Sequence, residues 1–140
     1  MHKKLFSASI AALVLATTTA FAESVSYKAD LRGSQEVPPV TGTATGSADL
    51  TYDTSTKKLT WKLTYSGLTG PATAAHFHGP AEAGKNAGVA VPITVGASPF
   101  DGSATLTDAQ AADLMAGKWY VNIHTAANKG GEVRGQVVKK

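Results

Sequence analysis

The 140-residue chain contains no cysteine, so no disulfide can support its fold. It is also poor in charge, with 13 Lys and Arg against 10 Asp and Glu, and it has no run of basic residues. Proteins that bind nucleic acid usually carry a basic patch or stripe, so we expect no nucleic-acid partner. A chain of this length can build a stable core, alone or together with a metal ion or a partner.

Long hydrophobic runs are absent as well, apart from one near the N-terminus. Residues 5–16 are mostly apolar but fall short of the roughly 20 residues that a membrane-spanning helix needs. Two lysines precede this stretch, and Ala20-Phe21-Ala22 follows it with the small-x-small pattern that signal peptidase recognises. We therefore expect residues 1–22 to be a cleaved signal peptide rather than a retained anchor. Residues 23–140 then form one periplasmic or secreted domain with no membrane span.

Apolar and polar residues alternate along three segments of the remaining chain, 25–32, 44–52 and 59–65. This period of two is typical of half-buried β-strands. Between the second and third segments, Asp53-Thr54-Ser55-Thr56 has the chemistry of a turn, so these two strands are predicted to form a hairpin. Further strands are expected near residues 74–78, 89–95, 103–106, 118–124 and 132–138.

One helix is predicted among the strands. Thr107 and Gln110 have the spacing of a capping box, alanine and leucine follow, and Gly117 is placed to end the helix. Many short strands punctuated by glycine and proline indicate an all-β fold. We expect an antiparallel β-sandwich or barrel, immunoglobulin-like or similar to copper–zinc superoxide dismutase, with this one short helix.

Histidine is scarce, and its placement is informative. After removal of the expected signal peptide the chain keeps three histidines. His76 and His78 flank Phe77 in a predicted strand, so both imidazoles face one side while Phe77 packs into the core. A later predicted strand carries His124 and Asn122 together on its polar face. All three imidazoles are thus expected to gather on one side of the fold.

A second hairpin adds polar groups to this face. If the last two predicted strands pair, Glu132 and Arg134 come close to His124. Three imidazoles, together with water or a carboxylate, suit Cu²⁺ or Zn²⁺. Glu132 is then either the fourth ligand or the acceptor of a second ring N–H, with Asn122 and Arg134 surrounding the ligands. The alternative is a polar network in which the histidines bond to backbone carbonyls and only brace the fold.

Four segments carry a resemblance to a known family. They are LRGSQEVPPV at 31–40, AHFHGPA at 75–81, GKWYVNIHT at 117–125 and NKGGEVRGQ at 128–136. In this order they resemble the CHRD domain, named after chordin, and the chain is similar to a stand-alone bacterial secreted form. The resemblance implies an extracytoplasmic β-sandwich-like domain. One departure is Lys129, where the family often has proline.

Two functions remain open at this point. The first is a non-catalytic binding module that holds a copper or zinc ion through the three histidines. The second is a structural or protein-interaction domain, with an extracytoplasmic protein as its partner, that needs no cofactor. An enzyme is disfavoured, because the two-metal site of copper–zinc superoxide dismutase needs more histidines than this chain has, including one that bridges two metals.

We predict that the mature protein begins at Glu23. Cleavage after Ala22 removes two lysines and no acidic residue, so both the mass and the charge of the protein change. Intact mass spectrometry of the exported protein checks this prediction. A mass that retains residues 1–22 would overturn it, and with it the expected export.

Overall fold

The computed structural model describes residues 4, 7–16 and 23–140. The cleavage site expected at residues 20–22 lies outside the described residues, and residues 7–16 have no helix or strand. The strands are β1 (Ser24–Arg32), β2 (Thr45–Asp53), β3 (Lys58–Ser66), β4 (Ala72–His78), β5 (Val89–Ile93), β6 (Phe100–Thr105), β7 (Tyr120–Thr125), β8 (Val133–Gln136) and β9 (Val138–Lys139). The helices are the short 3₁₀-helix η1 (Gly33–Gln35) and α1 (Asp108–Met115).

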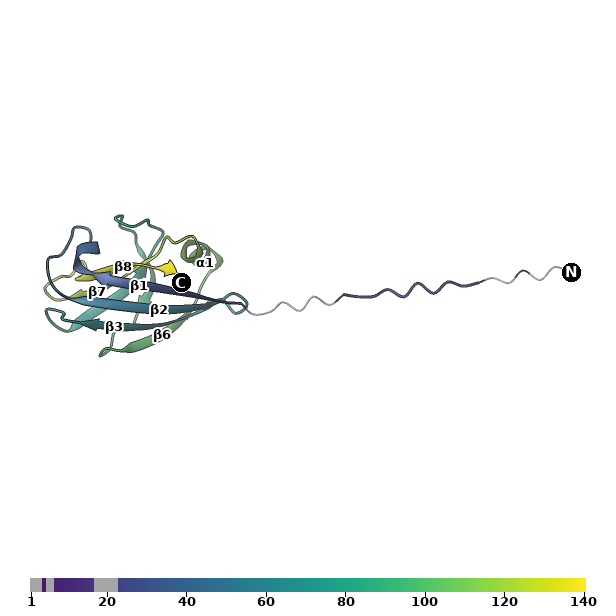
Figure 1. Cartoon of the computed structure of the whole chain (residues 1–140), viewed down its shortest axis with the longest axis horizontal. Helices are drawn as coiled ribbons and strands as arrows, with labels where there is room; N and C mark the ends of the chain where they lie inside the picture. The colour runs from purple at the N-terminus through teal and green to yellow at the C-terminus, as the bar shows by residue number, and fades with distance from the viewer. Residues whose placement is uncertain (1–3, 5–6, 17–22) are drawn as a thin grey trace.

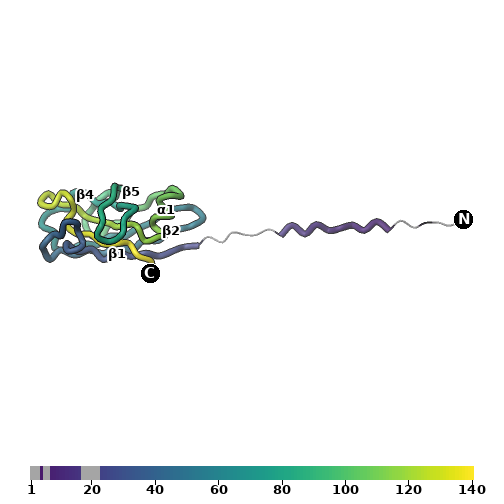
Figure 2. The backbone as a smooth tube through the Cα atoms, turned by 90° about the horizontal axis from the view of Figure 1, so that it is seen from above, coloured from purple at the N-terminus to yellow at the C-terminus, as the bar shows by residue number. Residues whose placement is uncertain are grey.

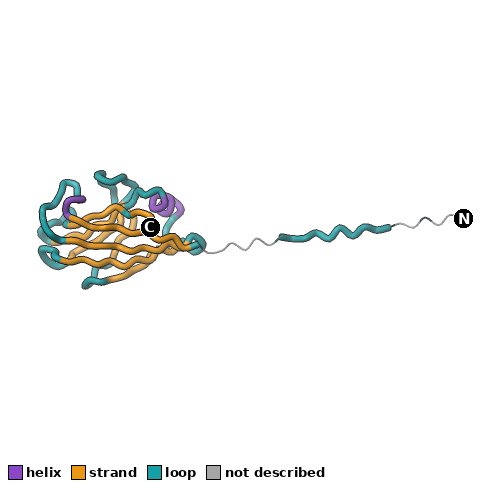
Figure 3. Tube along the Cα trace, viewed as in Figure 1, coloured by secondary structure: helices purple, strands orange, loops and turns teal. Residues whose placement is uncertain are grey.

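The strands form a single antiparallel sheet. Their order is β5-β4-β7-β8-β1-β2-β3-β6, and β9 pairs with β1. The sheet curls over, so that β4 and β5 lie on the side of the domain away from β1 (Figure 2). Strands dominate the domain and the helical segments are short (Figure 3). The predicted all-β antiparallel fold is confirmed, in the form of a nearly closed, barrel-like sheet (Figure 1).

The hairpin predicted from the alternating segments is present. β2 and β3 pair along nine residues each, and the ladder ends with Asp53 opposite Lys58. Asp53 Oδ1 accepts hydrogen bonds from the backbone N–H of Ser55 at 2.9 Å and of Thr56 at 3.0 Å. The short acidic side chain therefore satisfies backbone donors that the turn leaves without a partner in the ladder.

Aromatic residues connect the two sides of the curled sheet. Phe77 of β4 contacts Trp61 of β3, with ring centroids 5.2 Å apart, and Trp119, with centroids 5.5 Å apart. Phe77 and Trp119 are fully buried, and Trp61 is 6 % exposed. Such large buried rings supply much of the apolar area of a core. Phe77 is thus fixed inward, and its neighbours in β4 must point the other way.

Helix α1 forms as predicted and packs beside β5. The Gln110 N–H donates to Thr107 Oγ1 at 3.2 Å, and the Thr107 N–H donates to Gln110 Oε1 at 2.9 Å, so both halves of the capping box are present. Gly117, with a φ of 74°, follows the last turn. Leu114 is fully buried, and Gln110 Nε2 donates to Ala90 O of β5 at 2.9 Å. No helix among the described residues is long and apolar enough to cross a membrane.

The last predicted strand is divided in two. Residues 132–138 were expected to form one strand, whereas β8 and β9 are separated at Val137. Val137 is fully buried, and its N–H donates to Trp119 O at 2.9 Å. β8 begins at Val133, one residue after Glu132, and this boundary decides where the Glu132 side chain lies.

We expect Gly102→Ala to destabilise the domain. Gly102 of β6 lies opposite Trp61 in the β3–β6 ladder, and a Cβ atom at this position would lie 2.7 Å from the indole ring. The ring is packed against Phe77, so relief of the overlap should cost about 1–3 kcal/mol of the free energy of unfolding.

Urea denaturation measures this cost, with Gly42→Ala as the matched control. A Cβ atom at Gly42 meets no atom within 4 Å, so we expect this variant to match the parent within about 1 kcal/mol. If Gly102→Ala has the same unfolding midpoint as the parent, the close contact between the Trp61 ring and Gly102 is contradicted.

Candidate metal centre

The three histidines lie on two paired strands. In the β4–β7 ladder, His76 is opposite Asn122, and His124 is two residues further along β7. His78 is two residues along β4 from His76 and therefore shares its face. Because Phe77 between them is fully buried, the two imidazoles face away from the core. The predicted alternation along this strand is confirmed.

The three imidazole rings are close together. Their centroids are 4.9 Å apart for His76 and His124, 5.4 Å for His76 and His78, and 6.4 Å for His78 and His124. His76 Nδ1 lies 3.1 Å from His124 Nε2, and one ring nitrogen of each residue lies within 4.8 Å of the others. The ligand nitrogens of a tetrahedral Zn²⁺ ion are about 3.3 Å apart. Small side-chain movements therefore suffice to place all three nitrogens around one ion.

Two of the rings are oriented by hydrogen bonds to the backbone. His78 Nδ1 lies 3.0 Å from Ala87 O, and His124 Nδ1 lies 2.7 Å from Lys129 O. A carbonyl oxygen can only accept, so Nδ1 carries the hydrogen in both rings. In the neutral imidazole Nε2 then has a free lone pair. In both rings the Nε2 lone pair is thus available to ligate a metal ion.

Asn122 lies at the point where the rings converge. Its Oδ1 atom is 2.9 Å from His78 Nε2 and 3.0 Å from His124 Nε2. Its Nδ2 atom donates to Gly130 O at 3.4 Å, and the side chain is 3 % exposed in total. Asn122 was expected around the ligands, and the structure places its oxygen directly against His78 and His124.

Burial keeps His76 and His78 in the neutral form that binds metals. Burial, followed by the nearby His124 and His78, lowers the pKa of His76. Burial also lowers the pKa of His78, although its hydrogen bonds to Ala87 and Asn122 favour the protonated ring. A lowered imidazole pKa extends the neutral, ligating form to lower pH.

The loop between β4 and β5 is fastened beside His78. Tyr120 stacks on His78, with centroids 4.6 Å apart and planes 5° apart, and the Arg134 guanidinium carbon lies 3.5 Å from the centre of the Tyr120 ring. Arg134 Nη1 donates to Asn86 Oδ1 at 2.8 Å, and the Tyr120 hydroxyl donates to Ala87 O at 3.1 Å. Arg134, which was expected near the ligands, thus supports His78 through Tyr120 and this loop.

Glu132 does not join the histidines. Its Oε1 atom accepts hydrogen bonds from Asn128 Nδ2 at 2.9 Å and Thr125 Oγ1 at 3.2 Å, and Thr69 donates to the carboxylate from its N–H and its hydroxyl. Burial acts to raise the pKa of Glu132, but these hydrogen bonds outweigh it and hold the pKa below its usual value. The carboxylate therefore braces the chain segments around it.

The expected approach of Glu132 to His124 does not occur, for a physical reason. Alternation of side chains applies only within a ladder, and Glu132 precedes the first residue of β8. Within the described ranges Glu132 also forms no ion pair with Arg134. Glu132 is thus placed as a structural carboxylate.

Glu36 is a buried carboxyl beside the centre that the sequence pattern did not indicate. Its N–H donates to Gly33 O at 3.1 Å, which closes η1 and leaves the side chain directed inward and 4 % exposed. Burial raises the pKa of Glu36 to about 7, although the Arg134 charge and the Asn122 amide act to lower it. Its only sequence signal is its position in the segment 31–40, which has no local pattern pointing to the histidines.

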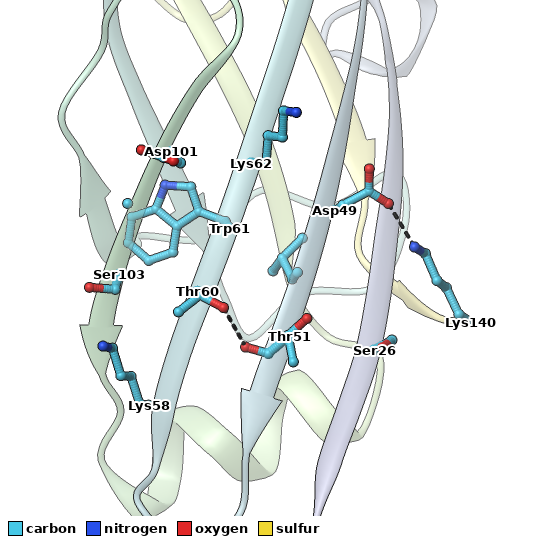
Figure 4. A pocket seen from close by; sticks show the side chains of 12 residues that line it. Ser26, Asp49, Thr51, Lys58, Thr60, Trp61, Lys62, Asp101, Ser103 and Lys140 are labelled. Atoms are coloured by element: carbon cyan, nitrogen blue, oxygen red, sulfur yellow. Dashed lines mark hydrogen bonds and ion pairs between the residues drawn. The ribbon is translucent and has the colours of Figure 1, made fainter.

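A separate depression of about 530 Å³ lies on the outer face of β2, β3 and β6 (Figure 4). Across these strands Asp49 is opposite Lys62, and Lys62 is opposite Asp101. Asp49 also forms an ion pair with Lys140 at 2.8 Å. Opposite charges on neighbouring strands stabilise a sheet. This surface is therefore explained by sheet stability, and it contains none of the residues predicted for a site.

Comparison with known proteins identifies the family of the chain. The family model of the CHRD domain matches residues 27–137, a range that includes the three histidines, Asn122 and Glu36. No curated protein and no solved structure matches.

We expect Glu36→Gln to become more stable relative to the parent as the pH rises. The folded parent keeps a proton on Glu36 up to about pH 7, whereas the carboxyl of the unfolded chain loses it near pH 4.5. Between these values Glu36 lowers the free energy of unfolding of the parent as the pH rises. Glutamine does not titrate, so the variant escapes this loss.

Chemical denaturation of the metal-free proteins at about pH 5 and about pH 8 measures the difference. His76 and His78 are present in both proteins, so their opposite pH dependence cancels in the comparison. Glu82→Gln removes a carboxyl at an exposed loop position and is the control for the substitution itself. A stability difference between Glu36→Gln and the parent that does not change with pH would contradict the raised pKa of Glu36.

Proposed function

The chain belongs to the CHRD domain family, and we propose that it is a binding module that holds one copper or zinc ion between His76, His78 and His124. The family match indicates a binding-type domain rather than an enzyme. The histidines of this chain supply the chemistry for a metal ion as the bound species. In this function they act as ligands, and the fold acts to orient them.

One observation carries the proposal. His78 and His124 both donate their Nδ1 hydrogen to a backbone carbonyl, and both direct Nε2 to the same Asn122 oxygen. Metal-ligating histidines almost always make such a bond with the second ring nitrogen, because it fixes the tautomer and the ring orientation. His76 Nδ1 then lies close to the same point, at 3.1 Å from His124 Nε2.

The donor set favours Cu²⁺ or Zn²⁺. Imidazole nitrogen suits both ions, and the chain has no cysteine that would select a softer ion such as Cu⁺. Four-coordinate Zn²⁺ sites with three histidines are common in proteins. At equal availability Cu²⁺ binds such nitrogen sites more tightly than Zn²⁺.

The proposed location of the protein is outside the cytoplasm. Export by a cleaved signal peptide is supported by three features of the N-terminal sequence: two lysines, the short apolar stretch after them, and the Ala20-Phe21-Ala22 pattern. Exported proteins often rely on disulfides, and this chain has none. A bound metal ion would stabilise its folded state instead.

A second candidate function is supported by the same hydrogen bonds. The bonds from His78 to Ala87 and from His124 to Lys129 also connect two loops to the sheet. The histidines would then brace a structural or protein-interaction domain. The two candidates differ in what a histidine variant loses: metal affinity in the first case, and stability without metal in the second.

We expect the parent to bind Zn²⁺ or Cu²⁺ at one site per chain and His78→Ala to bind at least about 10- to 100-fold more weakly. The loss of one imidazole removes a ligand, whereas Phe77 and the core stay in place. Binding by the parent should weaken at pH values below the ordinary imidazole pKa of about 6.5, because burial lowers the pKa of His76 and of His78 and a protonated imidazole cannot ligate. Isothermal titration calorimetry measures both effects.

Thr73→Ala is the matched control, because Thr73 is an exposed residue of the same strand. It should bind like the parent. Thermal melts of all three proteins without metal complete the experiment. No saturable binding by the parent, together with a clearly less stable His78→Ala, would assign the histidines to the fold.

A further inference from the structure

We infer that Asn122 supplies the fourth ligand of the metal ion through its side-chain oxygen, and that the buried Glu36 carboxyl orients the Asn122 amide for this role. The inference rests on the proposed metal site and completes it. It replaces Glu132, whose carboxylate is bound elsewhere, as the oxygen ligand. It also assigns a role to Glu36, the buried carboxyl beside the centre.

The position of the Asn122 oxygen is that of a ligand. It lies 2.9 Å and 3.0 Å from two histidine nitrogens, and the third histidine nitrogen lies 3.1 Å from one of these. Neighbouring ligand atoms around a tetrahedral Zn²⁺ ion are about 3.3 Å apart. The three short distances thus lie within a few tenths of an ångström of the edges of such a tetrahedron.

The atoms that meet at this point all carry lone pairs. Nε2 of His78 and of His124 are acceptors in the neutral rings, because each ring donates from Nδ1. Asn122 Oδ1 is an acceptor as well. Acceptors this close to one another repel unless a second ring proton or a cation lies between them. A divalent metal ion satisfies all of them at once, and a hydrogen bond between any two does not.

The orientation of the amide follows from its other end. Asn122 Nδ2 donates to Gly130 O at 3.4 Å, and the reverse orientation would set two oxygens against each other. Glu36 lies on this same side, because a Cβ atom at Gly131 would lie close both to Glu36 Oε1 and to Asn122 Nδ2. Both neighbours favour Nδ2 away from the histidines, so Oδ1 faces them.

Glu36 is available for this role. It is 4 % exposed, and within the described part of the chain its Oε1 atom has no hydrogen-bond partner. A buried carboxyl without a partner is costly, so its position needs an explanation. Its surroundings offer the Arg134 charge and the amide of Asn122, whose Nδ2 lies beside the same Gly131 as the carboxyl.

Gly131 leaves the space in which Glu36 and Asn122 meet. A Cβ atom at Gly131 would collide with Glu36 Oε1 and would lie 2.6 Å from Asn122 Nδ2. The φ of Gly131 is 119°, a conformation that residues with a side chain rarely adopt. Gly131 therefore allows the turn before β8 and also leaves room for the Glu36 carboxyl and the Asn122 amide.

The closing experiment uses Co²⁺ as a spectroscopic substitute and azide as an external ligand. If Asn122 fills the fourth position, azide should leave the visible spectrum of the Co²⁺-loaded parent unchanged. In Asn122→Ala a water molecule takes this position, so azide should shift the spectrum, and Co²⁺ affinity should fall about 10- to 100-fold. Asn122→Asp keeps an oxygen at the position and should resemble the parent.

Variants of Glu36 test the orienting role. Glu36→Gln keeps an acceptor for Asn122 and should resist azide like the parent, whereas Glu36→Leu should respond to azide. Loss of packing alone would lower stability in Glu36→Leu without opening the fourth position. Circular dichroism of each loaded protein confirms that the compared proteins are folded.

The outcomes separate the two proposals. If the parent binds no Co²⁺ or Zn²⁺, the metal-binding function itself fails, and the inference fails with it. If the parent binds the ion but azide shifts its spectrum as in Asn122→Ala, three histidines hold the metal and Asn122 is not a ligand. If Glu36→Leu resists azide like the parent, Glu36 does not orient the amide. The parent measurement needs no variant and decides the main claim alone.

Discussion

The pairing of β4 with β7 is the constraint on which the candidate centre depends. Burial of Phe77 between His76 and His78 fixes the side to which both imidazoles point, and the ladder sets His76 opposite Asn122. A slip of one residue in β4 would turn the imidazoles into the core and expose Phe77. The hydrophobic effect that closes the core therefore also brings the three imidazoles together, so the proposed metal site would need little rearrangement to form.

Local rules were sufficient to predict the histidine face. Alternation along a strand depends only on backbone geometry, so the outward direction of His76 and His78 followed from one buried aromatic between them. The same holds for the turn at Asp53 and the capping box at Thr107, where a side chain bonds to a backbone only two or three residues away. These elements could be read from the sequence because their partners are close in the chain.

The rest of the site depends on contacts that no local pattern encodes. Glu132 was expected beside His124, but it lies outside the ladder, where hydrogen bonds from Thr69 and Asn128 determine its direction. Glu36 reaches the centre because η1 packs against β8, the strand beside β7, which carries Asn122. Such contacts between distant segments arise from packing of the whole fold, and a single sequence gives no spacing from which to derive them.

X-ray absorption spectroscopy of the zinc-loaded parent tests the central claim most directly. We expect four nitrogen and oxygen neighbours at about 2.0–2.1 Å, together with the outer-shell scattering of three imidazole rings. This pattern identifies histidine ligands without any substitution in the protein. Zinc that is retained without imidazole scattering, or that is lost on dialysis, would contradict the account of His76, His78 and His124 as ligands of one metal ion.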